Sequence, residues 1–451
     1  MRSHRRSGSS PWIHATALLL TVVGAAAGLR AQPEPLPGTR PDILLVIADD
    51  MDYDHFGFRS PAAHTPTLDM LAAGGCVIER AWMAPKCAPS LAAILTGQHP
   101  HENGRFYNRL ASGAEIPLDH TETFVRYLDN AGYNTYCGGK WWEAEPTLLG
   151  FDAAQADQAN FVRNGQNHLL EWLDGVPPDE SFFIWWAPLL PHLPHNPRQH
   201  HLDLIDPARI VVPDYIAEAD RAEFIQKEHV LLAMTAWLDE GLEELLDHLH
   251  MLGRRENLLV VVCIDNGWSN GRVSKGSLYE KGMQSPLIFT HATLVPPGTS
   301  RRELASIVDI HPTILDFAGV QAAPRSDGLS LRPIIEGRST VWRTRLIEAA
   351  YPGIAYSDRW TDEVYGLAVR TDRFKFIGYL RDVREEDNYI LRIHHILAPF
   401  PRHLRNDQEL FDLSTDRVET ANLASLPGYE STVLGYRSII RDWWRRNIGP
   451  R

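Results

Sequence analysis

The 451-residue chain has few cysteines, no excess of basic residues and only one long apolar run, which lies near its N-terminus. Its 44 lysine and arginine residues against 57 acidic residues give a net charge of −13, so it lacks the broad basic surface that binds nucleic acid backbones. Cys76, Cys87, Cys137 and Cys263 are too few for a disulfide scaffold. The chain is 44% hydrophobic and 22% charged, which excludes a disordered protein. Its length of 451 residues predicts two or three domains, or one large core with an appendage.

The N-terminus has the pattern of an export signal. Three arginines within the first six residues precede an apolar run over residues 15–29, which is followed by the small residue Ala31. This order predicts a secretory signal peptide over residues 1–31, with a tethering helix as the alternative. The run is shorter than the roughly 20 residues of a membrane span, and no cysteine follows it to carry a lipid. We therefore expect a periplasmic or secreted protein without a membrane anchor, and a proline-rich lead-in over residues 32–40.

Apolar runs alternate with helical patterns over residues 41–337. The predicted strands are 43–47, 133–137, 182–187, 258–264 and 287–290, and the predicted helices are 65–75, 123–131, 219–252 and 306–317. This alternation favours an α/β domain with a mostly parallel central sheet sandwiched by helices.

The pattern changes in residues 338–451. Two apolar segments, 364–370 and 374–379, read as a hairpin, and a short strand is predicted at 409–413. An amphipathic helix over 429–445 closes the chain. Strands followed by a helix predict a small C-terminal α+β subdomain.

Two predicted strands end in adjacent oxygen donors. Asp49 and Asp50 follow the first strand, and Asp265 and Asn266 follow the strand that ends at Ile264. In open α/β sheets, ligands gather at the carboxyl ends of the strands. Three carboxylates and an amide are hard ligands that suit Ca²⁺ or Mg²⁺, whereas an isolated acid pair is usually a turn or a helix cap.

Cys87 lies at the expected start of a short helix. Ser90 is predicted to cap this helix, which runs through Leu95 and ends at Thr96 and Gly97. A helix N-terminus stabilises negative charge on a nucleophile and on a bound anion. A loop thiol without a role is the alternative for this segment taken alone.

Three further features receive plain structural interpretations. Trp185 and Trp186 are interpreted as core residues of a strand, with stacking on a sugar as the alternative. The charges over residues 239–244 are interpreted as the solvated face of a long helix. His200 and His201 have no carboxylate at a recognisable metal-binding spacing, and we assign them no role.

Residues 87–91 read Cys-Ala-Pro-Ser-Leu and resemble the Cys-x-Pro-Ser-Arg signature of the formylglycine-dependent (type I) sulfatase family of the alkaline-phosphatase superfamily. Further segments that resemble this family, in the family's order, are Thr-Pro-Thr-Leu-Asp at 65–69, Gly-Lys-Trp at 139–141, Pro-His-Leu-Pro at 191–194, Asp-Asn-Gly at 265–267 and Glu-Leu-Phe-Asp-Leu at 409–413. Each fragment is short, but their shared order is specific. The resemblance extends over nearly all of the chain after residue 40 and implies an alkaline-phosphatase-like fold.

The resemblance also implies a role for each matched residue. Asp49, Asp50, Asp265, Asn266 and the group derived from Cys87 would ligate one divalent cation, most often Ca²⁺ and alternatively Mg²⁺. Cys87 would be oxidised to formylglycine by a formylglycine-generating enzyme, and its hydrated form would attack the sulfur of a sulfate ester. Lys140 and Lys275 would supply positive charge to the sulfate oxygens, and His192 would protonate the departing alcohol.

Two positions depart from the family pattern. Leu91 replaces the arginine of the signature, and Trp142 replaces a histidine that follows Gly-Lys-Trp. Leucine offers neither charge nor donors, and indole is not a base. We expect a hydrolase that cleaves the sulfate ester of a sulfated small molecule or glycan. The alternatives are a non-catalytic pseudo-sulfatase that binds sulfated glycans, and a hydrolase of phosphate esters or phosphonates from the same superfamily.

Overall fold

The strand predicted from Ile43 onward is β1 (Asp42–Ala48), a strand buried along its whole length because it has neighbours on both sides and apolar layers on both faces. The computed structural model describes residues 40–105, 123–155, 160–270, 274–321, 325–339, 341–350, 364, 366–379 and 408–447. The predicted signal peptide and all but the last residue of the lead-in lie outside these residues. No helix in the described ranges is both long and apolar enough to cross a membrane.

Eight strands form the main sheet. The strands other than β1 are β2 (Cys76–Trp82), β3 (Asn134–Gly139), β4 (Ala153–Gln155), β5 (Phe182–Ala187), β6 (Leu258–Ile264), β7 (Gln284–Thr290) and β8 (Thr299–Ser306). Their order is β4-β3-β5-β1-β6-β7-β2-β8. Strand β7 runs antiparallel to β6 and β2, and all other neighbours are parallel. This confirms the predicted α/β class with a mostly parallel central sheet.

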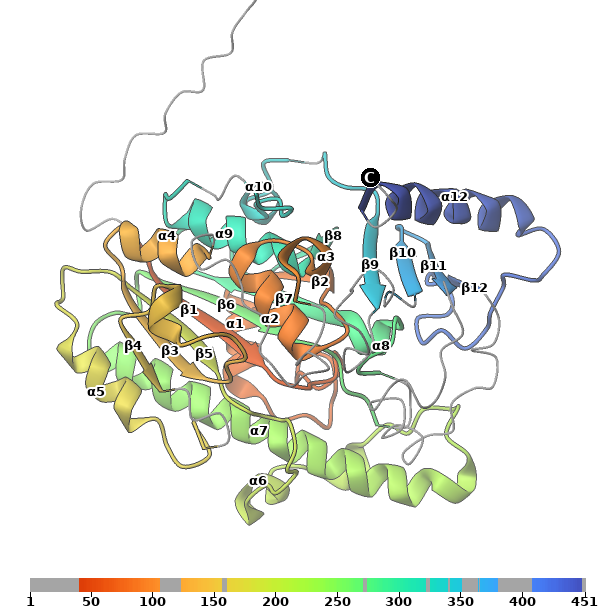
Figure 1. The fold of residues 1–451 in the computed structure, drawn as a ribbon. Helices are drawn as coiled ribbons and strands as arrows, with labels where there is room; N and C mark the ends of the chain where they lie inside the picture. The colour runs from red at the N-terminus through yellow and green to blue at the C-terminus, as the bar shows by residue number, and fades with distance from the viewer. Residues whose placement is uncertain are drawn as a thin grey trace, which may run out of the picture. The chain divides into compact units, whose positions relative to one another are not determined.

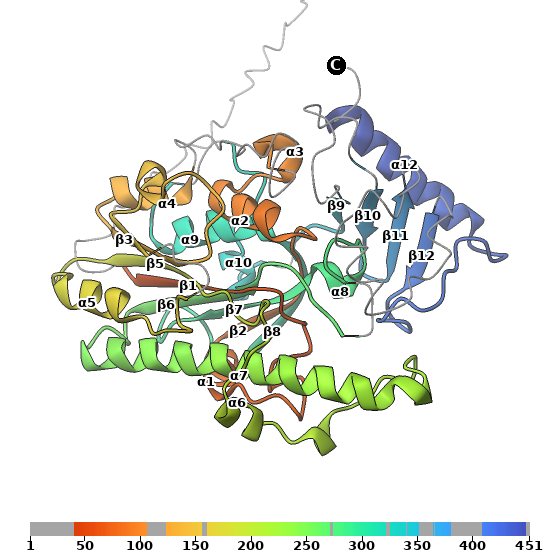
Figure 2. The same ribbon diagram turned by 60° about the horizontal axis from the view of Figure 1, so that its bottom comes forward.

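Helices cover both faces of this sheet (Figures 1 and 2). They are α1 (Pro66–Gly74), α2 (Cys87–Thr96), α3 (Pro100–Asn103), α4 (Phe124–Asn130), α5 (Asn167–Gly175), α6 (Gln199–Asp203), α7 (Arg221–Met251), α8 (Glu280–Met283), α9 (Ile310–Phe317) and α10 (Arg332–Ile335). Short 3₁₀ turns lie at Pro146–Leu149, Pro207–Arg209, Glu218–Asp220 and Ile307–Asp309.

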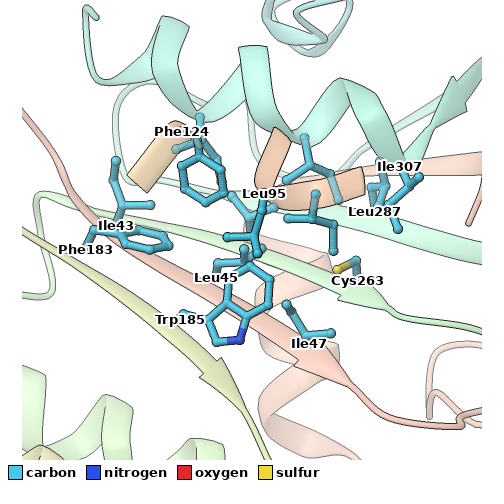
Figure 3. Packing of buried hydrophobic residues seen from close by; sticks show 14 of the residues in the cluster. Ile43, Leu45, Ile47, Leu95, Phe124, Phe183, Trp185, Cys263, Leu287 and Ile307 are labelled. Atoms are coloured by element: carbon cyan, nitrogen blue, oxygen red, sulfur yellow. The ribbon is translucent and has the colours of Figure 1, made fainter. Parts of the chain in front are cut away.

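The two faces of β1 belong to two separate apolar layers. Ile43, Leu45 and Ile47 pack with residues of α2, α4 and α9, as Figure 3 shows in close-up. Leu44 and Val46 point to the other face and pack with residues of α1, α5 and α7. Because side chains alternate along a strand, a central strand with two covered faces needs a continuous apolar run. The Trp185 and Trp186 side chains are both fully buried, one in each layer, which confirms their interpretation as core residues.

Strands β2, β4 and β8 of the main sheet were not predicted from the sequence. Strand β8 lies at the edge of the sheet, and its first half carries partly or fully exposed polar residues, Arg301 and Arg302 among them. An edge strand with a solvated half has no continuous apolar run, so the signal used for the buried strands is missing.

Helix α2 begins earlier than predicted. Cys87 is its first residue and Lys86 is its N-cap, so the prediction that Ser90 caps the helix is wrong. The Ser90 hydroxyl lies inside the helix and donates to the carbonyl of Ala84 at 3.0 Å. The predicted end is confirmed, since Gly97 has the left-handed conformation (φ 68°) that favours glycine after a helix.

The C-terminal part forms a second, antiparallel sheet. Its strands are β9 (Leu346–Ala350), β10 (Gly366–Arg370), β11 (Phe374–Tyr379) and β12 (Gln408–Asp412), in the order β12-β11-β10-β9, and α12 (Glu430–Asn447) packs on it. The predicted hairpin is the β10–β11 pair. Buried Glu280 of the main domain receives a hydrogen bond from Lys375 at 3.1 Å and pairs with Arg370. These contacts join the C-terminal sheet to the main domain.

Candidate active site

The two pairs of oxygen donors predicted from the strand ends lie side by side. Strands β1 and β6 are parallel neighbours, with Ala48 opposite Ile264, so the residues that follow them emerge at the same point of the sheet edge. Asp49, Asp50, Asp265 and Asn266, which we call the oxygen cluster, are all buried. The backbone N–H of Asp50 donates to Asp265 Oδ1 at 3.1 Å. Asp50 has a φ of 58°, and this strained conformation in a residue other than glycine is typical of functional sites.

Two buried lysines reach the oxygen cluster from other parts of the chain. Lys140 follows β3, and its Nζ donates to Asp265 Oδ2 at 2.8 Å and to Asp49. Gly139 makes this turn possible, because it has a φ of 92° and an added Cβ would lie 2.2 Å from the carbonyl oxygen of Ala187. Lys275 Nζ lies 2.5 Å from Asp50 Oδ1.

The segment around His192 lies against the end of β1. The backbone N–H of Asp49 donates to the Leu190 carbonyl at 2.9 Å, and His192 Nε2 lies 3.4 Å from Asp50 Oδ2. The His192 side chain is 29% exposed, so it faces the open side of the site. Arg163, which the sequence analysis missed, donates to the carbonyls of Leu189 and His192 at 2.8 Å each. No local motif marks Arg163, because its partners are backbone atoms about 30 residues away.

Cys87 lies at the N-terminus of α2 and is 2% exposed. Its thiol is close enough to Lys140 and Lys275 to affect the pKa of both. Lys86, the N-cap of α2, was also missed by the sequence analysis. Burial, with a smaller contribution from the charge of Lys275, lowers the pKa of Lys86 to about 7. The sequence feature that could have identified Lys86 as a site residue is its position directly before a cysteine in an otherwise apolar segment.

The lysines and carboxylates of the site stabilise each other's charged forms. Burial raises the pKa of Asp50, but Lys275 and His192 outweigh this effect and hold it well below its usual range. Burial lowers the pKa of Lys140, but the carboxylates of Asp265 and Asp49 raise it well above its usual value. The site is therefore a cluster of charged groups rather than of neutral ones.

The oxygen cluster fits a divalent cation. Asp49 Oδ2 and Asn266 Oδ1 are buried and have no hydrogen-bond partner in the described part of the chain. Unpartnered buried oxygens are rare in folded proteins, and each one needs an explanation. Three carboxylates also exceed the two lysines by one negative charge. A cation that accepts hard oxygen ligands accounts for both observations.

The two departures from the family motif occupy defined positions. Leu91 lies one helical turn after Cys87 on α2 and is buried in the apolar layer of that face. Trp142 is partly buried, and its Nε1 has no hydrogen-bond partner among the residues described. Leu91 therefore makes an apolar contact, and Trp142 carries a hydrogen-bond donor without a partner among the described residues.

The interpretation of the charges over residues 239–244 as a solvated helix face is confirmed for Glu240, Glu243 and Glu244, which are exposed, and wrong for Asp239. Asp239 is buried, because its carboxylate accepts the backbone N–H groups of Thr67 and Leu68 at 3.0 and 2.8 Å at the start of α1. His200 and His201 do have a carboxylate partner, Glu240, which lies on α7. Both partnerships join segments that are distant in the sequence.

Comparisons with known proteins agree with the fold and assign the chain to a family. A family model described as Sulfatase matches residues 41–320, which is more than half of the chain. A second model, described as N-sulphoglucosamine sulphohydrolase, C-terminal, matches residues 267–394.

Individual relatives are distant but extend over most of the chain. An ulvan-active sulfatase of Formosa agariphila is 22% identical over 415 residues, covering 87% of this chain and 77% of the relative. A solved structure described as a complex with its substrate D-glucosamine-2-N,6-O-disulfate has a TM-score of 0.73 at 20% identity and covers 90% of this chain and 98% of that chain. A phosphonate monoester hydrolase of Agrobacterium radiobacter has a TM-score of 0.70 at 17% identity and covers 90% and 96%.

Proposed function

This chain belongs to the sulfatase family of sulfuric ester hydrolases, and we propose that it is exported and removes a sulfate group from a carbohydrate. The observation that carries the proposal is the convergence of a buried oxygen cluster, two buried lysines and Cys87 at one edge of the sheet. A carbohydrate substrate is favoured because relatives along most of the chain are named for sulfated sugars and polysaccharides.

The oxygen cluster would hold one divalent cation, Ca²⁺ or Mg²⁺, because all its side-chain donors are hard oxygens. The resemblance to the sulfatase family favours Ca²⁺. When bound, the cation supplies positive charge to the sulfate oxygens and lowers the pKa of the attacking hydroxyl. Formylglycine formed from Cys87 supplies that hydroxyl. The position of Cys87 at the first residue of α2 directs the partial positive charge of the helix N-terminus toward the sulfate.

The chain's own side chains bind the sulfate and handle the proton. Lys140 and Lys275 stay charged in the buried site and donate to sulfate oxygens on which negative charge accumulates. His192 faces the open side, where the alcohol leaves, and it donates the proton that the alcohol oxygen needs when the S–O bond breaks. Leu91 offers none of the charge that the family arginine supplies, and Lys86, which is buried directly beside Cys87, would supply it only in its protonated form, because burial lowers its pKa to about 7.

Hydrolysis of a phosphonate or phosphate ester is the second candidate. Leu91 and Trp142 depart from the sulfatase motif, and a phosphonate monoester hydrolase shares the fold. The same cation and lysines would neutralise phosphonate oxygens. Turnover of a nitrophenyl sulfate against a nitrophenyl phenylphosphonate, measured on one preparation, separates the two candidates.

The decisive experiment is mass spectrometry of the peptide that contains Cys87, from protein coexpressed with a formylglycine-generating enzyme. We expect an aldehyde at position 87 and sulfate release that disappears in Cys87→Ala. Leu91→Arg restores the arginine of the signature and is expected to raise the converted fraction. A persistent thiol together with no sulfate release contradicts the proposal. Retention of sulfated glycan by such a protein would instead support a non-catalytic binder.

A further inference from the structure

A second group of metal-ligating side chains lies away from the oxygen cluster, where α6 packs on α7. His200 Nε2 and His201 Nε2 each lie 2.9 Å from the same atom, Oε2 of Glu240. One ligand atom from each of the three residues falls within 4.8 Å of the other two. We call these three residues the histidine cluster.

The convergence of two adjacent histidines in a helix is unusual. Successive side chains of an α-helix point about 100° apart, so neighbours in sequence do not normally face the same partner. Here the two imidazole rings have centroids 3.9 Å apart. His201 is fully buried and stacks on Trp237, with centroids 5.1 Å apart and an interplanar angle of 22°. The ring of His201 is therefore held in place, and Glu240 lies about one helical turn beyond Trp237 on α7.

The protonation states suit metal ligation. Burial lowers the pKa of His201, so its imidazole is neutral at pH 7. Burial raises the pKa of Glu240, but the hydrogen bonds of His200 and His201 lower it below its usual value, so it is a carboxylate. Metal binding requires neutral imidazoles and ionised carboxylates, so the ligands need lose few protons.

We propose that the histidine cluster is a second metal site, which binds one Zn²⁺ or a similar borderline transition-metal ion. Two imidazole nitrogens and one carboxylate oxygen are a common protein ligand set for zinc, with water in the remaining position. The side chains of His200 and Glu240 are 53% and 47% exposed, so an ion can enter from solvent and keep a water ligand. The site uses no residue of the proposed sulfatase chemistry and does not depend on it.

The hydrogen bonding of His201 limits the expected affinity. Its Nδ1 is buried and has no hydrogen-bond partner among the described residues. When Nε2 binds a metal, the ring proton resides on Nδ1, and a buried donor without an acceptor weakens binding by about tenfold to a hundredfold. We therefore expect a micromolar rather than a nanomolar dissociation constant.

The location suggests what a bound ion would stabilise. Helix α6 directly follows the segment that carries His192, and Arg198 donates to the carbonyl of Arg163 at 2.9 Å. Arg163 in turn donates to the His192 carbonyl. An ion bound between α6 and α7 therefore stabilises the hydrogen bonds of Arg198 and Arg163 that position the His192 segment.

The experiment is a zinc titration of the full chain by calorimetry, after removal of metals and in excess CaCl₂ so that the oxygen cluster does not take up zinc. We expect one Zn²⁺ per chain with a micromolar dissociation constant. His200→Ala and Glu240→Gln each weaken binding tenfold or more. Both side chains are about half exposed, so neither substitution threatens folding.

The matched control is His248→Ala. His248 also lies on α7 and pairs with one carboxylate, Asp174, at 2.9 Å, but no third ligand joins that pair among the residues that the structure describes. Its removal is expected to leave zinc binding unchanged. Absence of saturable zinc uptake, or equal binding by wild type, His200→Ala and Glu240→Gln, overturns the proposal. Neither result bears on sulfate release, which the Cys87 experiment tests separately.

Discussion

The oxygen cluster and the histidine cluster are built in opposite ways. The oxygen cluster is buried at the carboxyl ends of two neighbouring parallel strands, and its donors are carboxylates and an amide. The histidine cluster lies between two helices, with two of its three side chains about half exposed. The charges of the oxygen cluster lie in the interior and must be compensated by other charged groups there. The histidine cluster is open to water.

This difference determines what each cluster can select. Buried oxygens with two neighbouring lysines favour a hard cation and an anionic substrate at the same place. The imidazoles of the histidine cluster favour a borderline ion. The lysines that serve catalysis, Lys140 and Lys275, lie at the oxygen cluster instead. The two clusters should therefore respond to different ions and to different substitutions.

The substitution Asp265→Ala is expected to produce the largest difference between the two clusters. This change removes a cation ligand and an acceptor of Lys140, so kcat/KM for a sulfate ester should fall by about 10³-fold or more. Zinc binding at the histidine cluster should not change. Steady-state kinetics and calorimetry on one preparation test both, with Asp174→Ala as a surface carboxylate control. Retention of a tenth of the activity would show that the oxygen cluster is not the catalytic centre.

The next largest effect concerns the proton that His192 donates to the leaving alcohol. His192→Ala should lower the turnover of an alkyl sulfate by about 10²- to 10⁴-fold, because the leaving alcohol then lacks its acid. A nitrophenyl sulfate should suffer much less, because nitrophenolate leaves without a proton. His195→Ala is the control on the same segment, since burial lowers the pKa of His195 to about 4 and keeps it neutral at pH 7. Equal losses for the two substrates would exclude the acid role.

A smaller effect concerns the pH dependence of metal binding at the two clusters. A histidine must be deprotonated to bind zinc, so affinity falls as pH drops below the imidazole pKa. Because the pKa of His201 is lowered, its competition with protons begins at a lower pH than for an ordinary histidine. Zinc affinity should fall by about tenfold or more between pH 7 and pH 5. Ca²⁺ affinity should also fall, because burial and the neighbouring carboxylates raise the pKa of Asp265 to about 6, although Asp50 stays ionised. Parallel titrations at the two pH values measure both declines, and a zinc affinity that does not change with pH would contradict the prediction.

The smallest effect is thermal. Zinc at about 100 times its dissociation constant stabilises the folded state by about 2.7 kcal/mol, which corresponds to a rise in melting temperature of several degrees. His200→Ala should show no such rise. Melting curves in excess Ca²⁺ with and without zinc provide the measurement. A rise of the same size in the variant would assign the stabilisation to another site.

The contrast between the clusters also explains which residues the sequence revealed. Asp49 and Asp265 were predicted to meet because each ends an apolar strand, and parallel strands end at one edge. The C-terminal hairpin was equally readable from its two apolar segments. Strand β8 was missed because its solvated half carries arginines, and Glu240 was missed because nothing in its local sequence points to His200.

Wherever burial imposes a repeated pattern, the amino-acid sequence alone determined the outcome: the α/β class, the oxygen donors at the strand ends and the glycine that ends α2. Tertiary structure decided those contacts between distant segments that no repeated sequence pattern marks. Examples are the buried carboxylate of Asp239 against α1, the hold of Arg163 on the His192 segment, and the three ligands between α6 and α7. The physical reason is that periodic burial acts on neighbours along the chain, whereas a hydrogen bond or a metal site requires only proximity in space.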